Sequence, residues 1–130
     1  MIKALVLTHG AIGDELVRVV EMILGPVEGL DADSNRGRSA KEVAALVADW
    51  LQALDDESGG IVLIDDYGGS CASAALLGGA ERPHVTVVSG VNLAMLLAFV
   101  TWRDELDRTE LVQRMVDKAR EAVTVVGSGR

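Results

Sequence analysis

Short apolar runs alternate with stretches of helical spacing along this chain, and this alternation limits the fold more than any other feature. Such a pattern is typical of βαβ units and predicts an α/β fold with a mostly parallel sheet. The run at residues 61–64 is apolar throughout, so we expect a central strand there with both faces covered. The sequence shows no repeats, linkers or low-complexity segments, which favours a single domain over residues 1–130.

The predicted strands are short, and the predicted helices begin at residues suited to capping. Strands are expected at residues 2–8, 27–31, 61–64, 84–89 and 124–126. Helices are expected to start at Asp14, Ser39, Ser70, Asn92 and Thr109 and to end near residues 24, 54, 78, 100 and 122. Glu42 lies three residues after Ser39 and completes a capping-box pattern.

Composition excludes several classes of protein. The net charge of −8 argues against a nucleic-acid partner, because phosphate backbones need basic patches, and it suits a basic protein partner. The one cysteine excludes an internal disulfide and fits a reducing compartment. No apolar stretch reaches the roughly 18 to 20 residues that a membrane span needs, and no signal-like segment opens the chain. We therefore expect a cytoplasmic protein.

Two strand ends carry side chains that suit group transfer. His9 follows the first apolar run, and Asp65 and Asp66 follow the run at residues 61–64. Because the carboxyl ends of parallel strands meet at one edge of a sheet, these side chains are expected to face one crevice. A neutral imidazole is a good nucleophile, and one carboxylate can fix its tautomer through a hydrogen bond. Asp65 comes directly after the strand and is preferred to Asp66 for this role.

A glycine-rich turn next to these carboxylates adds a possible anion site. Gly68, Gly69 and Ser70 precede a predicted helix, where backbone N–H groups point outward and the helix dipole favours anions. The neighbouring Cys71 is interpreted as a packing residue, and His84 as a surface residue at the start of a strand. These groups together suit a phosphoryl group carried on His9.

Three segments resemble a known family in order and spacing. They are Thr8-His9-Gly10, the run from Asp65 to Ser70, and the run from Ser89 to Leu97, with Glu21-Met22-Ile23-Leu24-Gly25 adding to the likeness. They look like the mannose-family IIA domain of the bacterial phosphoenolpyruvate-dependent sugar phosphotransferase system. The resemblance covers nearly all of the chain.

The resemblance carries expectations about fold and assembly. It implies a flavodoxin-like three-layer sandwich and a homodimer. It also implies that a C-terminal antiparallel strand at residues 124–126 is exchanged between subunits.

The same resemblance assigns roles to the site residues. His9 would be the phosphoacceptor, Asp65 its hydrogen-bond partner, and Ser70 a phosphate-contacting residue beside Gly68 and Gly69. The donor would be the phosphocarrier HPr and the acceptor a IIB component. A membrane would be met only indirectly, through a transporter complex. No metal cluster is visible in the sequence, and the scheme needs neither a metal nor a cofactor.

Departures from the family pattern leave an alternative open. Cys71-Ala72-Ser73 stands where the family commonly has Pro-Phe-Asn, and Ala94 stands where many members have proline. The alternative function is a regulatory phosphoacceptor that controls a partner protein instead of feeding sugar transport. A histidine phosphatase is disfavoured because no arginine adjoins His9, and a dinucleotide site because Gly10 and Gly13 do not complete a G-x-G-x-x-G motif.

Overall fold

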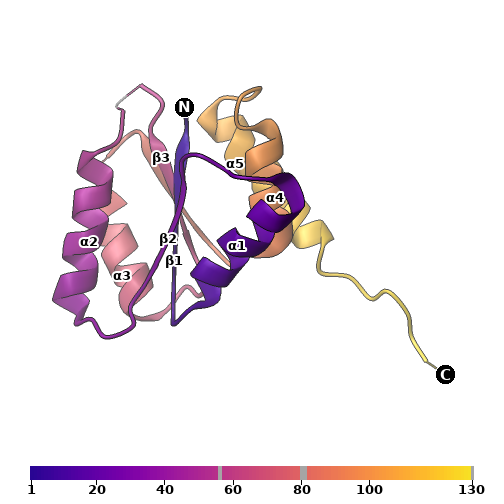
Figure 1. The fold of residues 1–130 in the computed structure, drawn as a ribbon, viewed down its shortest axis with the longest axis horizontal. Helices are drawn as coiled ribbons and strands as arrows, with labels where there is room; N and C mark the ends of the chain where they lie inside the picture. The colour runs from indigo at the N-terminus through magenta and orange to yellow at the C-terminus, as the bar shows by residue number, and fades with distance from the viewer. Residues whose placement is uncertain (56, 80–81, 130) are drawn as a thin grey trace.

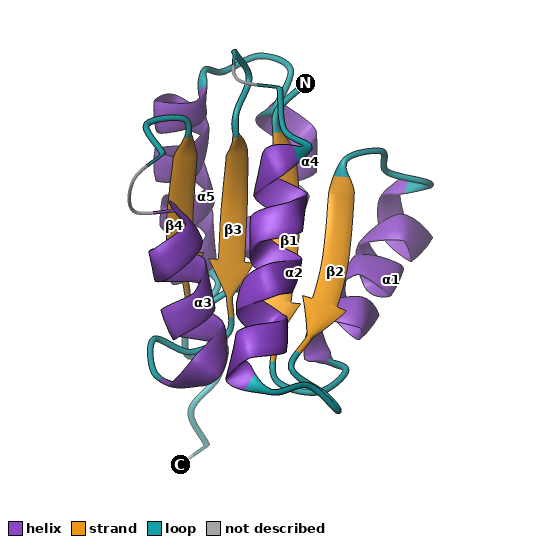
Figure 2. Cartoon of the chain, turned by 90° about the vertical axis from the view of Figure 1, so that its left-hand side faces the viewer, coloured by secondary structure: helices purple, strands orange, loops and turns teal. Residues whose placement is uncertain are grey.

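A four-stranded parallel sheet forms the centre of the molecule in the computed structural model, which describes residues 1–55, 57–79 and 82–129. The strands are β1 (Lys3–Thr8), β2 (Leu30–Ser34), β3 (Gly60–Ile64) and β4 (Val85–Ser89). They lie in the order β2-β1-β3-β4, and every pair is parallel (Figure 2).

Helices cover both faces of this sheet. They are α1 (Ile12–Leu24), α2 (Ala40–Gln52), α3 (Gly69–Gly79), α4 (Leu93–Trp102) and α5 (Arg108–Glu121). Figure 1 shows α2 and α3 on one side of the sheet and α1, α4 and α5 on the other. The result is the three-layer α/β sandwich of the flavodoxin-like class, as predicted.

Side chains alternate in direction along β1 and β3, and this alternation gives each face of the sheet its own hydrophobic core. Ala4 and Val6 point into the core under α1, α4 and α5, whereas Leu5 and Leu7 point into the core under α2 and α3. All four side chains are at most 2% exposed. A strand buried on both faces must be apolar at every position, which is why these strands read as continuous hydrophobic runs.

The connections leave β1 in opposite directions and so create a topological switch point between β1 and β3. The chain passes from β1 through α1 to β2 on one side, then returns through α2 to β3 on the other side of β1. In open α/β sheets, ligands bind at such a switch point, outside the carboxyl ends of the strands. His9 and Asp65 follow the two strands that flank this point.

The N-cap of the first helix lies three residues earlier than expected. Its N-cap is Ala11, which makes no side-chain cap, and the expected cap Asp14 lies inside the first turn. The hydroxyl of Thr8 instead accepts the backbone N–H of Gly13 at 2.7 Å. The hydroxyl at the end of β1 thus accepts a hydrogen bond from a helix N–H that would otherwise need a capping side chain.

The prediction for β2 was wrong in position by three residues. Residues 27–31 were expected, but the strand runs from Leu30 to Ser34 and pairs Ala4 with Leu30 and Thr8 with Ser34. Because β2 lies at the edge of the sheet, it tolerates polar residues such as the exposed Asp31. The position of β2 is therefore decided by its pairing with β1 and not by its weak apolar pattern.

The last helix is capped by Asp107, and the expectation of a cap at Thr109 was wrong. The Asp107 carboxylate accepts the backbone N–H of Glu110 at 2.9 Å. Thr109 is already inside α5. In contrast, the predicted capping box of Ser39 and Glu42 and the predicted cap at Asn92 are confirmed.

Beyond α5 the chain leaves the body of the molecule (Figure 1). Residues 124–126 form no strand in this single chain, and Val123, Val125 and Val126 are 80%, 80% and 95% exposed. An exchanged strand would need a second copy of the chain. Within the described residues, no helix has both the length and the apolar character needed to cross a bilayer.

The cap of α5 gives a direct stability test. Asp107→Ala should lower the free energy of unfolding by about 1 kcal/mol, because it leaves a helix N–H without its acceptor. Thr109→Ala, two residues away, should change it by less than about 0.5 kcal/mol. Urea unfolding followed by circular dichroism measures both. Equal losses in the two variants would contradict the assignment of the cap to Asp107.

Candidate functional site

His9 sits in the turn between β1 and α1, and this turn is fastened to its neighbours. Gly10 has a φ of +57°, a left-handed conformation that glycine adopts at little cost and that turns the chain sharply after the histidine. The side-chain oxygen of Asn35, in the loop after β2, accepts the Gly10 N–H at 3.3 Å. The Asn35 N–H in turn donates to the carbonyl of Thr8. The backbone around His9 is therefore held from the side of β2.

Asp65, at the end of β3, holds His9 from the other side. Its Oδ2 accepts the backbone N–H of His9 at 3.1 Å and lies 3.0 Å from the ring Nδ1; Oδ1 lies 3.2 Å from the same nitrogen. The Asp65 side chain is 16% exposed and that of His9 is 43% exposed. The carboxylate is thus largely covered while part of the imidazole remains open to solvent.

This geometry sets the tautomer of the ring. An ionised carboxylate only accepts hydrogen bonds, so Nδ1 must carry the proton in the neutral imidazole. The lone pair then lies on Nε2. A carboxylate that orients an imidazole through Nδ1 leaves the opposite nitrogen as the nucleophile or base.

The space beside Nε2 is bounded by Gly69. A β-carbon built on this glycine would lie 3.3 Å from Nε2 and 3.6 Å from Cε1. Gly69 has a φ of +87°, so a larger residue there would be strained as well as crowded. The missing side chain leaves room for a group on Nε2.

Two opposing effects set the pKa of Asp65. Partial burial raises the pKa of this carboxyl, because the charged form loses hydration. The hydrogen bonds from the backbone N–H and the ring of His9 stabilise the charged form and lower the pKa by more. The net result is a pKa below the ordinary value for aspartate. Asp65 is therefore ionised near neutral pH and able to hold the Nδ1 proton.

The predicted anion nest lies where α3 begins. Gly68 and Gly69 lead into this 11-residue helix, and Ser70 is its second residue. The first N–H groups of a helix have no intrahelical acceptor, and its dipole favours negative charge there. A β-carbon built on Gly69 would lie against the ring of His9, whereas one built on Gly68 would not; among the described residues, Ser70 forms no hydrogen bond with His9.

The remaining sequence candidates lie elsewhere. Asp66 is exposed, and no hydrogen bond to it occurs among the described residues. His84 is exposed just before β4, at the amino end of the sheet and so at the opposite end from His9. Cys71 is fully buried in the core under α2 and α3, and burial, with a smaller effect of the charge on Asp65, raises the pKa of its thiol. This burial fits the packing role expected for Cys71.

The loop after β2 supplies groups that sequence reasoning missed. The sequence pattern indicates only a polar connection at residues 33–38. In the structure Asn35 binds the His9–Gly10 turn, and the guanidinium of Arg36 lies over Gly10, with Nη2 3.6 Å from the position of a β-carbon on that glycine. The sequence did offer a signal, the arginines at positions 36 and 38 of this loop. Their importance for the site follows only once β2 is known to pair with β1.

Fold and site together define a doubly wound α/β domain with an oriented histidine at its switch point. A family model described as "PTS system fructose IIA component", EIIA-man, matches residues 3–116. The PTS system mannose-specific EIIAB component of Escherichia coli K12 is 33% identical over 118 residues. The chain belongs to the EIIA-man family, and the resemblance to mannose-family IIA domains is confirmed. The match covers 89% of this chain but 36% of that relative, so the chain spans about a third of the relative's length.

Solved structures share the fold at lower identity. The phosphotransferase component EIIA from Streptococcus agalactiae superposes with a TM-score of 0.88 at 24% identity, covering 96% of this chain and 97% of that one. The mannose/sorbose-specific IIA subunit from Enterococcus faecalis gives 0.83 at 22% identity, with 98% and 96% covered. At these identities the likeness establishes the fold alone.

The tautomer of His9 can be tested by nitrogen NMR. In the native protein at a pH where the ring is neutral, Nδ1 should carry the proton. Asp65→Asn should reduce the population of that tautomer, because the amide group can donate to Nδ1 as well as accept from it. Asp66→Asn, one residue along, should leave the ring nitrogens unchanged. A larger response to Asp66→Asn would contradict the geometry described above.

Proposed function

We propose that this protein is a phosphohistidine carrier of a sugar phosphotransferase system. It accepts a phosphoryl group from phospho-HPr on Nε2 of His9 and passes it to a IIB component. The observation that carries the proposal is the contact of Nδ1 with Asp65, which leaves Nε2 free beside the space that Gly69 keeps open. As proposed, the carrier acts in the cytoplasm and meets a membrane only through a transporter complex.

The proposed transfer balances without a cofactor. The Nε2 lone pair forms the new N–P bond while the bond from phosphorus to the donor breaks, and the donor atom keeps that electron pair. The Nδ1 proton stays in its hydrogen bond to Asp65, whose charge offsets the positive charge that develops on the ring. Phosphoryl transfer depends mainly on positioning and on stabilising charge on the phosphoryl oxygens. We assign the second task to the backbone N–H groups at Gly68 and Gly69 and to the hydroxyl of Ser70.

The family supports the proposed partners. Matched relatives are phosphotransferase-system components, and those from Escherichia coli are named EIIAB, a name that joins a IIA and a IIB part. A IIB component is therefore the acceptor that we propose for this chain. No observation on the site favours the regulatory alternative, in which phosphorylation of His9 would act as a switch without onward transfer.

Labelling with phospho-HPr tests the carrier function. The native protein should acquire one acid-labile phosphoryl group, located on His9. His9→Ala should acquire none, and His84→Ala should be labelled like the native protein because His84 lies at the far end of the sheet. Mass spectrometry of the intact chains measures both. Full labelling of His9→Ala would refute the assignment, and transfer of the label to a IIB domain distinguishes the carrier from the regulatory alternative.

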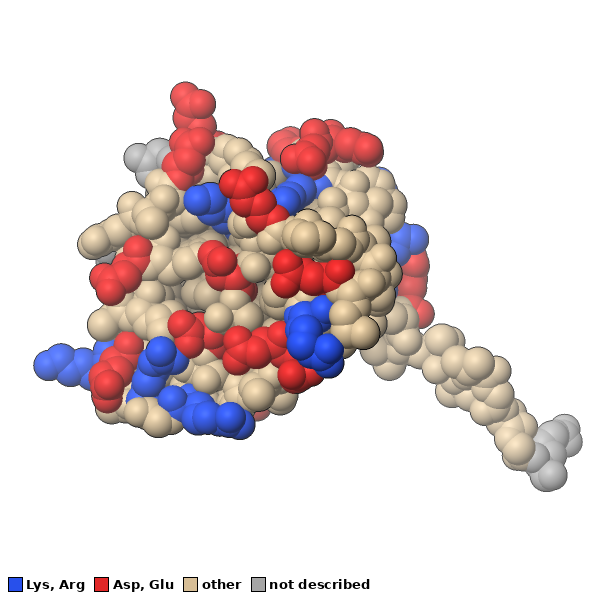
Figure 3. Space-filling view, viewed as in Figure 1, with Lys and Arg blue, Asp and Glu red and all other residues tan. Residues whose placement is uncertain are grey.

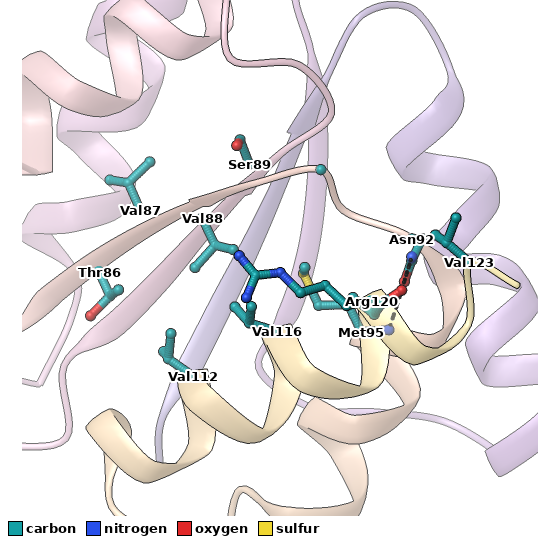
Figure 4. A pocket seen from close by; sticks show the side chains of 12 residues that line it. Thr86, Val87, Val88, Ser89, Asn92, Met95, Val112, Val116, Arg120 and Val123 are labelled. Carbon is teal, nitrogen blue, oxygen red and sulfur yellow. Dashed lines mark hydrogen bonds between the residues drawn. The ribbon is translucent and has the colours of Figure 1, made fainter.

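The homodimer is a second part of the proposal and rests on a groove beside the edge strand. Figure 4 shows this groove between β4 and α5, with the side chain of Arg120 extending across it toward Val88. Its volume is about 510 Å³. The lining residues come mainly from these two elements: Thr86, Val87, Val88, Ser89, Gly90, Asn92, Met95, Val112, Val116, Ala119, Arg120 and Val123.

We infer that the terminal segment of a second copy occupies this groove. Among the described residues, β4 pairs only with β3, so its outer edge presents free backbone donors and acceptors. Val125 and Val126 are exposed in the single chain and match the apolar lining. The strand exchange implied by the family resemblance would pair the free edge of β4 and bury the exposed valines at the same time. Each copy would give its residues 124–126 to the other copy's β4.

Truncation distinguishes strand exchange from other modes of association. A chain ending at Ala122 should lose the dimer in analytical ultracentrifugation and should melt at a lower temperature, because β4 loses its neighbour. A chain ending at Val126 keeps the proposed strand and should behave like the native protein. If the chain ending at Ala122 remained dimeric with unchanged stability, strand exchange would be wrong.

A further inference from the structure

The loop after β2 places a cation beside the turn that carries His9. Arg36 is exposed, and its Nη2 lies over Gly10, the residue that follows His9. The loop itself is fixed, because Asn35 bonds to both Thr8 and Gly10. The Arg36 N–H also donates to the hydroxyl of Ser34. The backbone that carries the guanidinium is therefore anchored to the same turn that carries the histidine.

The two arginines of this loop differ in their contacts. The Arg38 guanidinium binds the carboxylate of Asp33 and donates to the carbonyl of Ser34 at 2.8 Å. Among the described residues, no hydrogen bond or ion pair engages the Arg36 guanidinium. Arg38 thus helps to shape the loop, whereas all five N–H donors of Arg36 remain available to a ligand.

The charge of the proposed intermediate calls for such a cation. A phosphoryl group on a side chain carries between about one and a half and two negative charges at pH 7. Here it would form beside the ionised Asp65 and close in sequence to Asp66, on a chain of net charge −8. In Figure 3 acidic side chains are spread over the face shown, and several basic side chains lie along its lower edge, where Figure 1 shows the loop between β2 and α2, with others near the top and on the right.

We propose that Arg36 binds the phosphoryl group on His9 and stabilises it by charge-assisted hydrogen bonds. This inference rests on the proposed phosphocarrier function and adds a residue to it. An exposed arginine changes rotamer freely, and its planar fork matches two phosphoryl oxygens. The glycine at position 10 lets the guanidinium lie close to this turn, because a β-carbon there would already be 3.6 Å from Nη2. The site then surrounds the phosphoryl group from two sides, with backbone N–H groups from the α3 side and a guanidinium from the β2 side.

The test measures the phosphoryl group itself, in the absence of any partner protein. The native protein, Arg36→Gln, Arg36→Lys and Lys41→Gln are phosphorylated with phospho-HPr, purified and titrated by phosphorus NMR. A nearby cation favours the dianion, so Arg36→Gln should raise the pKa of the phosphoryl group by roughly half a unit after allowance for solvent screening. Lys41 is exposed in the first turn of α2, and Lys41→Gln makes the same change in net charge and should not move that pKa.

Rates give a second readout. Arg36→Gln should slow phosphorylation about tenfold, and its rate should depend less on salt than the rate of the native protein. The rate of Arg36→Lys should fall between those of Arg36→Gln and the native protein. Circular dichroism should show an unchanged fold, because the Arg36 side chain is exposed.

The outcomes separate this inference from the proposed function. A native protein that acquires a phosphoryl group on His9, together with a phosphoryl pKa in Arg36→Gln equal to that in Lys41→Gln, overturns the role of Arg36 alone. The proposed contact is overturned even if the rate falls, since a slower reaction with an unchanged pKa means that Arg36 contacts the donor protein instead. A native protein that is not labelled on His9 overturns both proposals.

Discussion

The parallel pairing of β1 with β3 is the constraint on which the rest of the structure depends. Leu7 pairs with Ile64, so the two strands end side by side, and the residues that follow them meet at the edge of the sheet. A slip of one residue would exchange the buried faces of a strand and move Asp65 away from His9. Such a slip would exchange Ala4 and Val6 with Leu5 and Leu7 between the two cores, and the mismatch in side-chain volume opposes it. The hydrophobic core therefore fixes the distance between the two side chains that we assign to the chemistry.

The sequence predicted the central features because they depend on strong local patterns. The continuous apolar runs of β1 and β3 are typical of buried strands, and the contact between His9 and Asp65 follows from their order in a parallel sheet. β2 was misplaced because its pattern is polar, and pairing with β1 alone decides its register. The caps at Asp14 and Thr109 were wrong because the true acceptors, Thr8 and Asp107, were each a plausible end of the preceding segment.

The loop after β2 shows what a sequence without tertiary contacts conceals. Asn35 and Arg36 look like ordinary loop residues until the sheet brings them to the His9 turn. The surroundings of His9 then have two unlike sides. The β3–α3 side contributes a carboxylate and main-chain donors, and the β2–α2 side contributes an amide and a guanidinium. Asp65 orients the imidazole from the β3–α3 side, and the proposed contacts to the phosphoryl group come from both sides.

The main chain at Gly69 bounds the space beside Nε2 of His9. Side chains sample rotamers, but the backbone at the start of α3 is tied into a helix and has no such freedom. The space beside Nε2 is therefore bounded by backbone instead of by a mobile side chain. Ile12, in the first turn of α1, and Tyr67, in the loop after β3, are in contrast exposed side chains that are free to change rotamer. Under the proposed function, a space beside Nε2 that is bounded by backbone, together with mobile side chains on the adjoining segments, would let one histidine meet two different partners in turn, one delivering the phosphoryl group and the other removing it.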